Sequence, residues 1–379
     1  MNLVLIPDKF KGSLSADEVC DAIAEGLGQH QPAARFRRFA ASDGGDGFLD
    51  AVRATREVSL HTEVVSGPLG REIRAEYLLD PASGEAFVEM ALASGMVLLE
   101  EGERDPLQTS TLGTGQLIRS AVGQGARRVY VGLGGSATND AGMGIAAAFG
   151  FEFLGADGRL LRPVGASLGE VSRVVAPREV LPKGVEVVAV NDVSNPLWGP
   201  NGAACVYAPQ KGAGPEAVEQ LDRGLRRLDQ VVARQLGLEA GTEAGAGAAG
   251  GTAYGLKVFL GARFIGGTDF VFRLNGIAEY LEEAAVDGIF TGEGRIDSQS
   301  LQGKLIQGVT ALGAEHGIPV YAVCGTCTAN REALRDAGLT AVIEAANPGR
   351  DLQWNMAHAG ELVREAVARY FADHPISGS

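Results

Sequence analysis

The strongest constraint on the fold is an alternation of strand and helix patterns near both ends of the chain. Leu3–Ile6 is a continuous apolar run, and Ser15 with Glu18 three residues later predicts a capped helix after it. Residues 35–40 predict a second strand, and the pattern returns late in the chain with three more strands followed by helices, at 287–291, 318–324 and 340–344. Strands that alternate with helices require a parallel sheet covered on both faces. We therefore expect an α/β fold with a flavodoxin-like, doubly wound parallel sheet built from both chain ends in the order 2-1-3-4-5.

The middle of the chain has a mixed α+β pattern and predicts a second, inserted domain. A meander of three strands is expected at 62–65, 73–79 and 85–90, and a hairpin is expected at 151–161. Helices are expected at 114–122, 140–149 and 215–236. The predicted organisation is a discontinuous flavodoxin-like domain of residues 1–62 and 284–379, with residues 63–283 inserted. The stretch 239–251 is rich in Gly and Ala, a composition that predicts a flexible loop or lid.

Charge and composition exclude several classes of function. With 33 Lys and Arg against 47 Asp and Glu, the formal net charge is −14, so the basic footprint of a nucleic-acid-binding protein is missing. No apolar run approaches the roughly 18 residues of a membrane span, and the first residues lack the pattern of a secretory leader. We expect a cytoplasmic protein without a membrane partner. The 4 cysteines are too few for a disulfide scaffold, and Cys324 and Cys327 lack further zinc ligands nearby, which leaves a redox role open.

Two loop segments are predicted to meet where the strand order of the sheet reverses, which is where doubly wound sheets bind ligands. One segment follows the first strand and contains Lys9, Lys11, Gly12 and Ser13 at a helix N-terminus. The other, 292–297, follows the strand at 287–291. Lysine side chains and helix N-terminal N–H groups favour a bound anion such as phosphate. The alternative is that both lysines are ordinary exposed side chains.

Carboxylates in glycine-rich turns form a second pattern. Asp43 and Asp46 lie in one such turn, Asp192 follows a predicted strand, and Glu293 and Asp297 flank Arg295. Oxygen ligands of this kind suit Mg²⁺, which is bound by a few carboxylates together with waters and substrate phosphates. The pattern therefore favours phosphoryl transfer, although each aspartate could serve only as a turn or helix-cap residue.

A glycine-rich loop, 132–140, follows a predicted strand and opens a helix, so its backbone N–H groups are available to an anion. It lacks the Lys-Ser/Thr ending of a P-loop and the G-x-G-x-x-G spacing of a dinucleotide site. It is loosely similar to the corresponding loop of the galactokinase and mevalonate kinase superfamily, whose order of elements the chain lacks. None of the 5 histidines falls in any of these clusters, which disfavours a Ser-His-Asp hydrolase.

Taken together, these motifs resemble the bacterial glycerate kinases of the type 1 family almost from end to end. The motifs that carry the resemblance, in chain order, are DKFKGS at 8–13, DGGDG at 43–47, GPLG at 67–70, GLGGSATND at 132–140, NPL at 195–197, PQKGA at 209–213, GAAGG at 247–251 and TGEGRID at 291–297. The resemblance implies an ATP- and Mg²⁺-dependent kinase that phosphorylates D-glycerate, usually at the 2-hydroxyl. Asp46, where Glu is common, and Ala141, where Gly is common, are mild departures from the family pattern.

With that resemblance, site roles can be assigned as hypotheses, with the active site expected in the cleft between the two domains. Asp192 is expected to accept the substrate hydroxyl proton, with Lys11 and Asp297 as further catalytic groups. Arg295 is expected to pair with the glycerate carboxylate. Cofactor contacts are expected from Lys9, Gly12, Ser13, Gly292, Glu293 and Gly294; substrate contacts from Asn195, Ser136, Asn139 and Lys211; and Mg²⁺ ligation from Asp43 and Asp46.

Two other functions remain open at this point. One is a kinase of the galactokinase and mevalonate kinase type that acts on another small alcohol, and the other is a non-catalytic sensor that closes around a sugar acid. The sequence leaves open whether the protein is a monomer or a homodimer.

Overall fold

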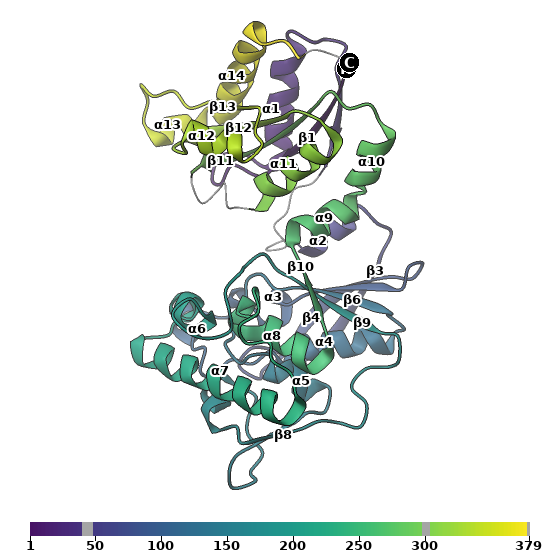
Figure 1. Ribbon diagram of the computed structural model, residues 1–379, viewed down its shortest axis with the longest axis vertical. Helices are drawn as coiled ribbons and strands as arrows, with labels where there is room; N and C mark the ends of the chain where they lie inside the picture. Colours follow the sequence, from purple (N-terminus) through teal and green to yellow (C-terminus); the bar gives the residue numbers. More distant parts are fainter. Residues whose placement is uncertain (40–47, 298–303, 377–379) are drawn as a thin grey trace. The chain divides into compact units, whose positions relative to one another are not determined.

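The computed structural model describes residues 1–39, 48–297 and 304–376. The chain divides into two compact units: unit 1 comprises residues 1–43 and 268–379, and unit 2 comprises residues 44–267. Figure 1 labels the elements of each unit. The predicted turn with Asp43 and Asp46 lies outside the described residues.

Unit 1 contains a parallel sheet of five strands in the order β13-β12-β11-β1-β2. The predicted fold class and strand order are confirmed, with Val4 of β1 opposite Ile289 of β11. The strands are β1 (Asn2–Pro7), β2 (Arg35–Arg38), β11 (Gly288–Ile296), β12 (Val320–Cys327) and β13 (Ala341–Glu344). The helices are α1 (Ala16–Gly28), α10 (Ile277–Glu283), α11 (Lys304–His316), α12 (Arg331–Asp336), α13 (Leu352–Ala357) and α14 (Ala359–Asp373), with α9 (Gly267–Asn275) at the border of the two units.

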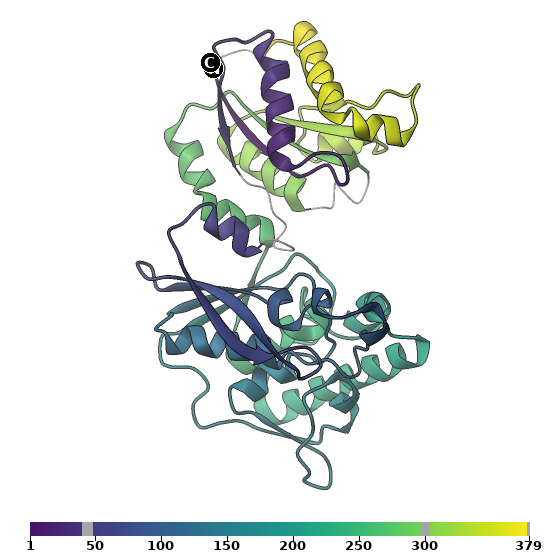
Figure 2. The same ribbon diagram turned by 180° about the vertical axis from the view of Figure 1, so that it is seen from behind.

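Both faces of this sheet are buried, which is why its strands read as unbroken apolar runs. Leu3 and Leu5 of β1 pack into one core with α1 and α14, whereas Val4 and Ile6 pack into the core on the opposite face with α10 and α11. Figure 2 shows α1 and α14 side by side on the first of these faces. Gly26 permits their contact, because a Cβ there would lie 2.6 Å from the carbonyl oxygen of Arg364.

Unit 2 contains a mixed sheet of six strands in the order β10-β9-β6-β5-β4-β3. The first four strands of that order are parallel, and the meander β3-β4-β5 is antiparallel as predicted. The strands are β3 (Ser59–Ser66), β4 (Glu72–Asp80), β5 (Glu85–Glu89), β6 (Arg128–Gly132), β9 (Glu186–Val190) and β10 (Arg263–Ile265), with a separate pair β7 (Glu152–Leu154) and β8 (Arg173–Val175). The α-helices are α2 (Phe48–Arg53), α3 (Ala91–Ser94), α4 (Leu112–Gly123), α5 (Met143–Ala148), α6 (Ala203–Tyr207), α7 (Pro215–Leu236) and α8 (Ala248–Leu260). Short 3-10 helices span Met96–Leu98, Glu101–Glu103, Gly165–Glu170 and Pro209–Lys211.

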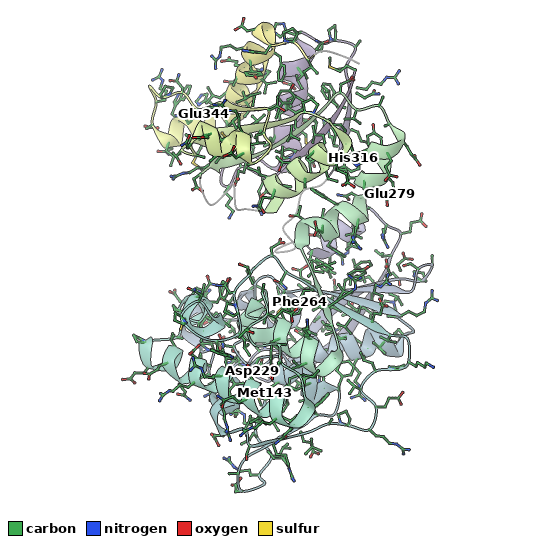
Figure 3. All side chains as sticks on the ribbon, viewed as in Figure 1. Met143, Asp229, Phe264, Glu279, His316 and Glu344 are labelled. Atoms are coloured by element: carbon green, nitrogen blue, oxygen red, sulfur yellow. The ribbon has the colours of Figure 1, made fainter. Side chains whose placement is uncertain are left out.

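The predicted hairpin at 151–161 is only partly present. Leu161 N–H donates to the Phe153 carbonyl (2.8 Å), yet the strand partner of β7 is β8. The helix α7 has the predicted bounds, and its Asp229, labelled in Figure 3, accepts a hydrogen bond from Trp198 Nε1 (2.9 Å). The amphipathic spacing of α7 explains why this helix was readable from sequence.

The borders of the two units differ from the predicted 62/63 and 283/284. Helix α2 lies in unit 2, where Leu49 N–H donates to Glu89 of β5 (3.2 Å). At the other border, Ile277 and Leu281 of α10 pack in the core of Val4 and Ile6, which places α10 in unit 1. Contacts between residues distant in sequence, which a single sequence does not display, decide both borders.

Much of the Gly- and Ala-rich stretch at 239–251 is buried in unit 2, which contradicts the expectation of a flexible loop or lid. Ala246 and Ala248 are buried, and helix α8 begins within the stretch. Gly250 has φ +68°, and a Cβ on it would lie 2.0 Å from the Thr138 carbonyl oxygen. Small residues are needed here because two backbone segments approach closely. The resulting Gly- and Ala-rich composition is the same as that of a mobile loop.

Candidate functional site

The first candidate site lies in unit 1 at the carboxyl ends of β1 and β11, where the strand order reverses. Asp8 N–H donates to the Gly292 carbonyl (2.8 Å) and thereby extends the strand pairing into the loop. Phe10 is buried and anchors a tight turn, since both Ser13 N–H (2.9 Å) and Leu14 N–H (3.0 Å) donate to its carbonyl. This geometry fixes the backbone of the predicted anion-binding loop.

The lysines of this loop, rather than the helix terminus, are the groups available to an anion. Lys9 and Lys11 are exposed, and within the described residues neither ammonium group makes an ion pair. The N-terminus of α1 is instead closed by its own residues: Glu18 accepts from Ser15 N–H (2.8 Å), and Ser15 Oγ accepts from Glu18 N–H (3.3 Å). The Ser13 hydroxyl donates to the Phe10 carbonyl (3.1 Å) and thus supports the turn.

A cavity of about 740 Å³ lies against this loop, wholly within unit 1. It brings together five of the predicted site residues, namely Lys9, Lys11, Glu293, Gly294 and Arg295. Asp8, which adjoins Lys9, lines it as well. Ser13 also lines it, and Gly12 adjoins a smaller hollow beside it. Gly292 lies beneath, with a Cβ position only 2.0 Å from the Val323 carbonyl, and Arg295 pairs with Asp297 at 3.8 Å. The volume of the cavity falls in the range of small-molecule sites.

The sequence analysis missed the far wall of this cavity. Residues after β13, on α13 and on α14 complete the lining, among them Leu352, Asn355, Met356 and Val363. Their sequence pattern is that of ordinary amphipathic helices, so nothing in it signals a site.

The second candidate site lies in unit 2, in the glycine-rich loop that leaves the carboxyl end of β6. Lys211 Nζ donates to Ser136 Oγ (2.8 Å) and to the Thr138 carbonyl (2.7 Å). The 3-10 turn that carries Lys211 ends at Gly212, whose φ is +99° and whose Cβ position lies 2.2 Å from the Arg104 carbonyl. Two of the predicted substrate residues, 75 positions apart, are therefore in direct contact.

Lys211 is buried, with 2% of its surface exposed. Burial penalises the charged ammonium group and lowers its pKa to about 7, while the carboxylate of Asp140 partly opposes the shift. Lysines with pKa values near neutrality can gain or lose a proton under physiological conditions, which ordinary surface lysines do not. A buried lysine whose charge depends on pH near 7 therefore lies against the loop.

Asp140 fixes the end of the same loop. Its fully buried carboxylate accepts from Thr111 N–H and Oγ (both 2.8 Å) and from the N–H groups of Gly142 and Gly144 (both 3.1 Å). Burial nevertheless raises the pKa of this carboxyl, against the opposite influence of those hydrogen bonds. Asp140 is the last residue of the loop motif and follows Asn139 directly. This position is the sequence signal that could have indicated that Asp140 anchors the loop.

Asn139 is the least satisfied polar residue of the loop. Its side chain is fully buried, and neither its amide nitrogen nor its amide oxygen has a hydrogen-bond partner among the described residues. The hydroxyl of Thr138 is in the same state. Buried polar groups are nearly always paired, so these unpaired ones make the loop a candidate binding site.

The remaining predicted residues of unit 2 have partners within the fold. Asp192, at the carboxyl end of β9, accepts from Gly267 N–H through Oδ1 (2.8 Å). Asn195 donates to the Asn201 carbonyl (2.8 Å) and accepts from the Tyr207 hydroxyl (2.6 Å), so its amide stabilises its own loop.

Two features are absent from the described residues. No group of three or more His, Cys, Asp or Glu side chains is placed to hold a metal ion there. No helix within the same residues is long and apolar enough to cross a bilayer.

Each unit therefore presents a glycine-rich loop at the carboxyl ends of parallel strands with lysine side chains in it or against it, the arrangement of an α/β protein with candidate sites for small molecules. Comparison with known proteins gives the family. The chain belongs to the glycerate kinase family, which it matches over residues 3–374. It is a kinase, a phosphotransferase with an alcohol group as acceptor.

Curated relatives and a solved structure agree with this membership. The chain is 37% identical over 373 residues to the glycerate kinase of Halalkalibacterium halodurans, covering 96% of each chain. It is 36% identical over 343 residues to the glycerate 2-kinase of Escherichia coli, covering 90% of each. A crystal structure named for glycerate kinase 2 of Salmonella typhimurium LT2 superimposes with a TM-score of 0.80, at 36% identity and 98% coverage of both chains. The similarity to the galactokinase and mevalonate kinase superfamily is thus limited to one loop.

Proposed function

We propose that this protein transfers the γ-phosphoryl group of ATP to the 2-hydroxyl of D-glycerate, giving 2-phosphoglycerate and ADP. Family membership along nearly the whole chain supports the reaction class, and the name of the Escherichia coli relative supports the 2-hydroxyl. The structural observation that carries the proposal is the unit 1 cavity, which combines Lys9, Lys11 and Arg295 with room for a small-molecule ligand.

In unit 1, Lys9 and Lys11 hold phosphate oxygens and neutralise their charge, which is the main requirement of phosphoryl transfer. Arg295 is proposed to pair with the glycerate carboxylate through its planar, two-pronged guanidinium group. Gly12, Gly292 and Gly294 allow close approach of the phosphates to the backbone.

The carboxylates of Asp8 and Glu293 line the same cavity as the lysines. Proteins supply Mg²⁺ with only one or two carboxylates when phosphates and waters complete its shell, so this donor set fits the ion. Asp43 and Asp46, which lie outside the described residues, are proposed as further ligands. When bound, Mg²⁺ would neutralise charge on the phosphate oxygens.

In unit 2, Asp192 is proposed as the base that accepts the proton of the 2-hydroxyl as the oxygen–phosphorus bond forms and the bond to the ADP oxygen breaks. Lys211, Ser136 and Asn139 are proposed to bind oxygen atoms of the substrate. Asn195 is proposed to position the loop that follows Asp192, because its own amide is already hydrogen-bonded.

The direct test is incubation with Mg²⁺, ATP and D-glycerate, with the product identified by phosphorus NMR beside authentic 2- and 3-phosphoglycerate. A resonance that coincides with 2-phosphoglycerate is expected. A 3-phosphoglycerate signal would overturn the assignment of the hydroxyl, and intact ATP with folded protein would overturn the proposed substrate.

A further inference from the structure

The cavity of unit 1 has two chemically different sides. Its charged side comes from the loop after β1 and the end of β11, with Lys9, Lys11 and Arg295. Its apolar side comes from α13 and α14, with Leu352, Met356 and Val363. A ligand that fills about 740 Å³ of such space carries anionic groups at one end and an apolar or aromatic group at the other.

The apolar side is held in place by a dense set of hydrogen bonds. The Asn355 side chain accepts from Asn347 N–H (2.7 Å) and donates to the carbonyls of Asn347 (3.1 Å), Arg350 (3.2 Å) and Asp351 (2.9 Å). Asp351 caps α13 by accepting from Trp354 N–H (2.8 Å). A helix of only six residues is thus fixed at the cavity edge, which lowers the entropy cost of ligand binding there.

The two sides are adjacent in space. A Cβ on Gly12, next to Lys11, would lie 2.7 Å from the Cε methyl of Met356, so this thioether reaches the cationic loop. Ala345 and Ala346 also line the cavity, and their N–H groups donate respectively to the carbonyls of Cys324 and Gly325 (both 2.8 Å). Leu352, which also lines the cavity, is 74% exposed and so offers apolar surface that a ligand can cover.

We propose that unit 1 binds the nucleotide, with the purine ring against Met356, Leu352 and Val363 and the phosphates toward Lys9 and Lys11. This assignment rests on the proposed function, since it takes ATP as the phosphoryl donor. Flexible thioethers make favourable contacts with aromatic rings, so Met356 suits an aromatic base. Asn355 acts as the positioning residue of the wall.

The test measures binding by isothermal titration calorimetry with three probes: ADP, adenosine and inorganic tripolyphosphate. Met356→Gln preserves size and charge but removes apolar contact, so it is expected to weaken ADP and adenosine about tenfold and to leave tripolyphosphate unchanged. Lys11→Met is expected to weaken ADP and tripolyphosphate and to leave adenosine unchanged. Met356→Leu is expected to retain most of the affinity for adenosine.

Surface variants keep the test independent of folding. Leu352→Gln changes an exposed side chain and is expected to weaken adenosine, whereas Leu160→Gln, at a 63% exposed leucine of unit 2, is the matched control without effect. Unchanged adenosine affinity in both the Met356 and Leu352 variants, or failure of the unaltered protein to bind ADP, would overturn the nucleotide assignment. Turnover of glycerate by the unaltered protein is measured separately. If the protein turns over glycerate but the variants show no loss of binding, only this inference is overturned. If the protein binds ADP but does not turn over glycerate, only the proposed function is overturned.

Discussion

The buried Lys211 predicts an unusual dependence of stability on pH. A fall of its pKa from the ordinary 10.5 to about 7 corresponds to about 5 kcal/mol, at roughly 1.36 kcal/mol for each pH unit. Below pH 7 the ammonium is charged in both the folded and the unfolded chain, so the full cost of burying the charge is present. Between pH 7 and 10.5 only the unfolded chain holds the proton, so the folded state gains stability as pH rises.

The perturbation is Lys211→Met, which removes the charge while keeping the length of the side chain. From pH 6.5 to 8.5 the linkage relation gives the unaltered protein a gain of about 2 kcal/mol in unfolding free energy relative to this variant. Urea unfolding at several pH values measures the difference. Tryptophan fluorescence in a Trp354→Phe background reports on unit 2, because Trp198 is then the remaining one of the 2 tryptophans.

The control is Lys183→Met, at an exposed lysine of the same unit, whose profile should run parallel to that of the unaltered protein. Parallel profiles for Lys211→Met as well would refute the reasoning, since they would mean that Lys211 titrates alike in the folded and unfolded states.

Three further predictions concern unit 2. Asp140→Asn should lower the unfolding free energy by about 3 kcal/mol, because a buried carboxylate with four donors is lost; an unchanged urea midpoint would contradict this. Asp192→Asn should cut turnover at least about a hundredfold with an unchanged circular dichroism spectrum, and near-normal turnover would place the base elsewhere. Gly250→Ala should lower the unfolding free energy by more than about 2 kcal/mol, because the new Cβ meets the Thr138 carbonyl. Gly237 has nearly the same φ (+69° against +68°) but open space around it, so Gly237→Ala should cost only the backbone strain of about 1 kcal/mol. Equal thermal shifts for the two variants would refute the role of close contact with Thr138.

The fold of unit 1 could be predicted because each level of its sequence agrees with the others. The run Leu3–Ile6 is apolar at every position since the strand is buried on both faces, and Ser15 with Glu18 marks the helix start through a capping box that the structure contains. The unit borders could not be predicted in the same way. Helix α2 is joined to β5 of unit 2 and helix α10 packs in a core of unit 1, and both arrangements depend on contacts distant in sequence.

The candidate site shows the same division. The motifs drew attention to Lys211 and Ser136, but the direct hydrogen bond between them depends on tertiary structure across 75 residues. Asn195 has the chemistry of a substrate contact, yet the fold directs its amide to Asn201 and Tyr207. The apolar wall around Met356 carries no chemical signature at all, because an amphipathic helix that lines a cavity reads like one that covers a core.

The glycines of unit 2 connect stability to chemistry. Gly250 approaches the Thr138 carbonyl, which also accepts from Lys211, and Gly255 approaches the Ala141 carbonyl at 2.3 Å from its Cβ position. These contacts leave the loop 132–141 little freedom. The Lys211 side chain is buried against this loop at the free-energy cost worked out above. Phosphoryl transfer depends on groups positioned before the reaction, since no energy is then spent on reorienting them. The instability of a buried lysine and the rigidity around it are therefore two consequences of one arrangement, and relief of the first by Lys211→Met should come with loss of activity.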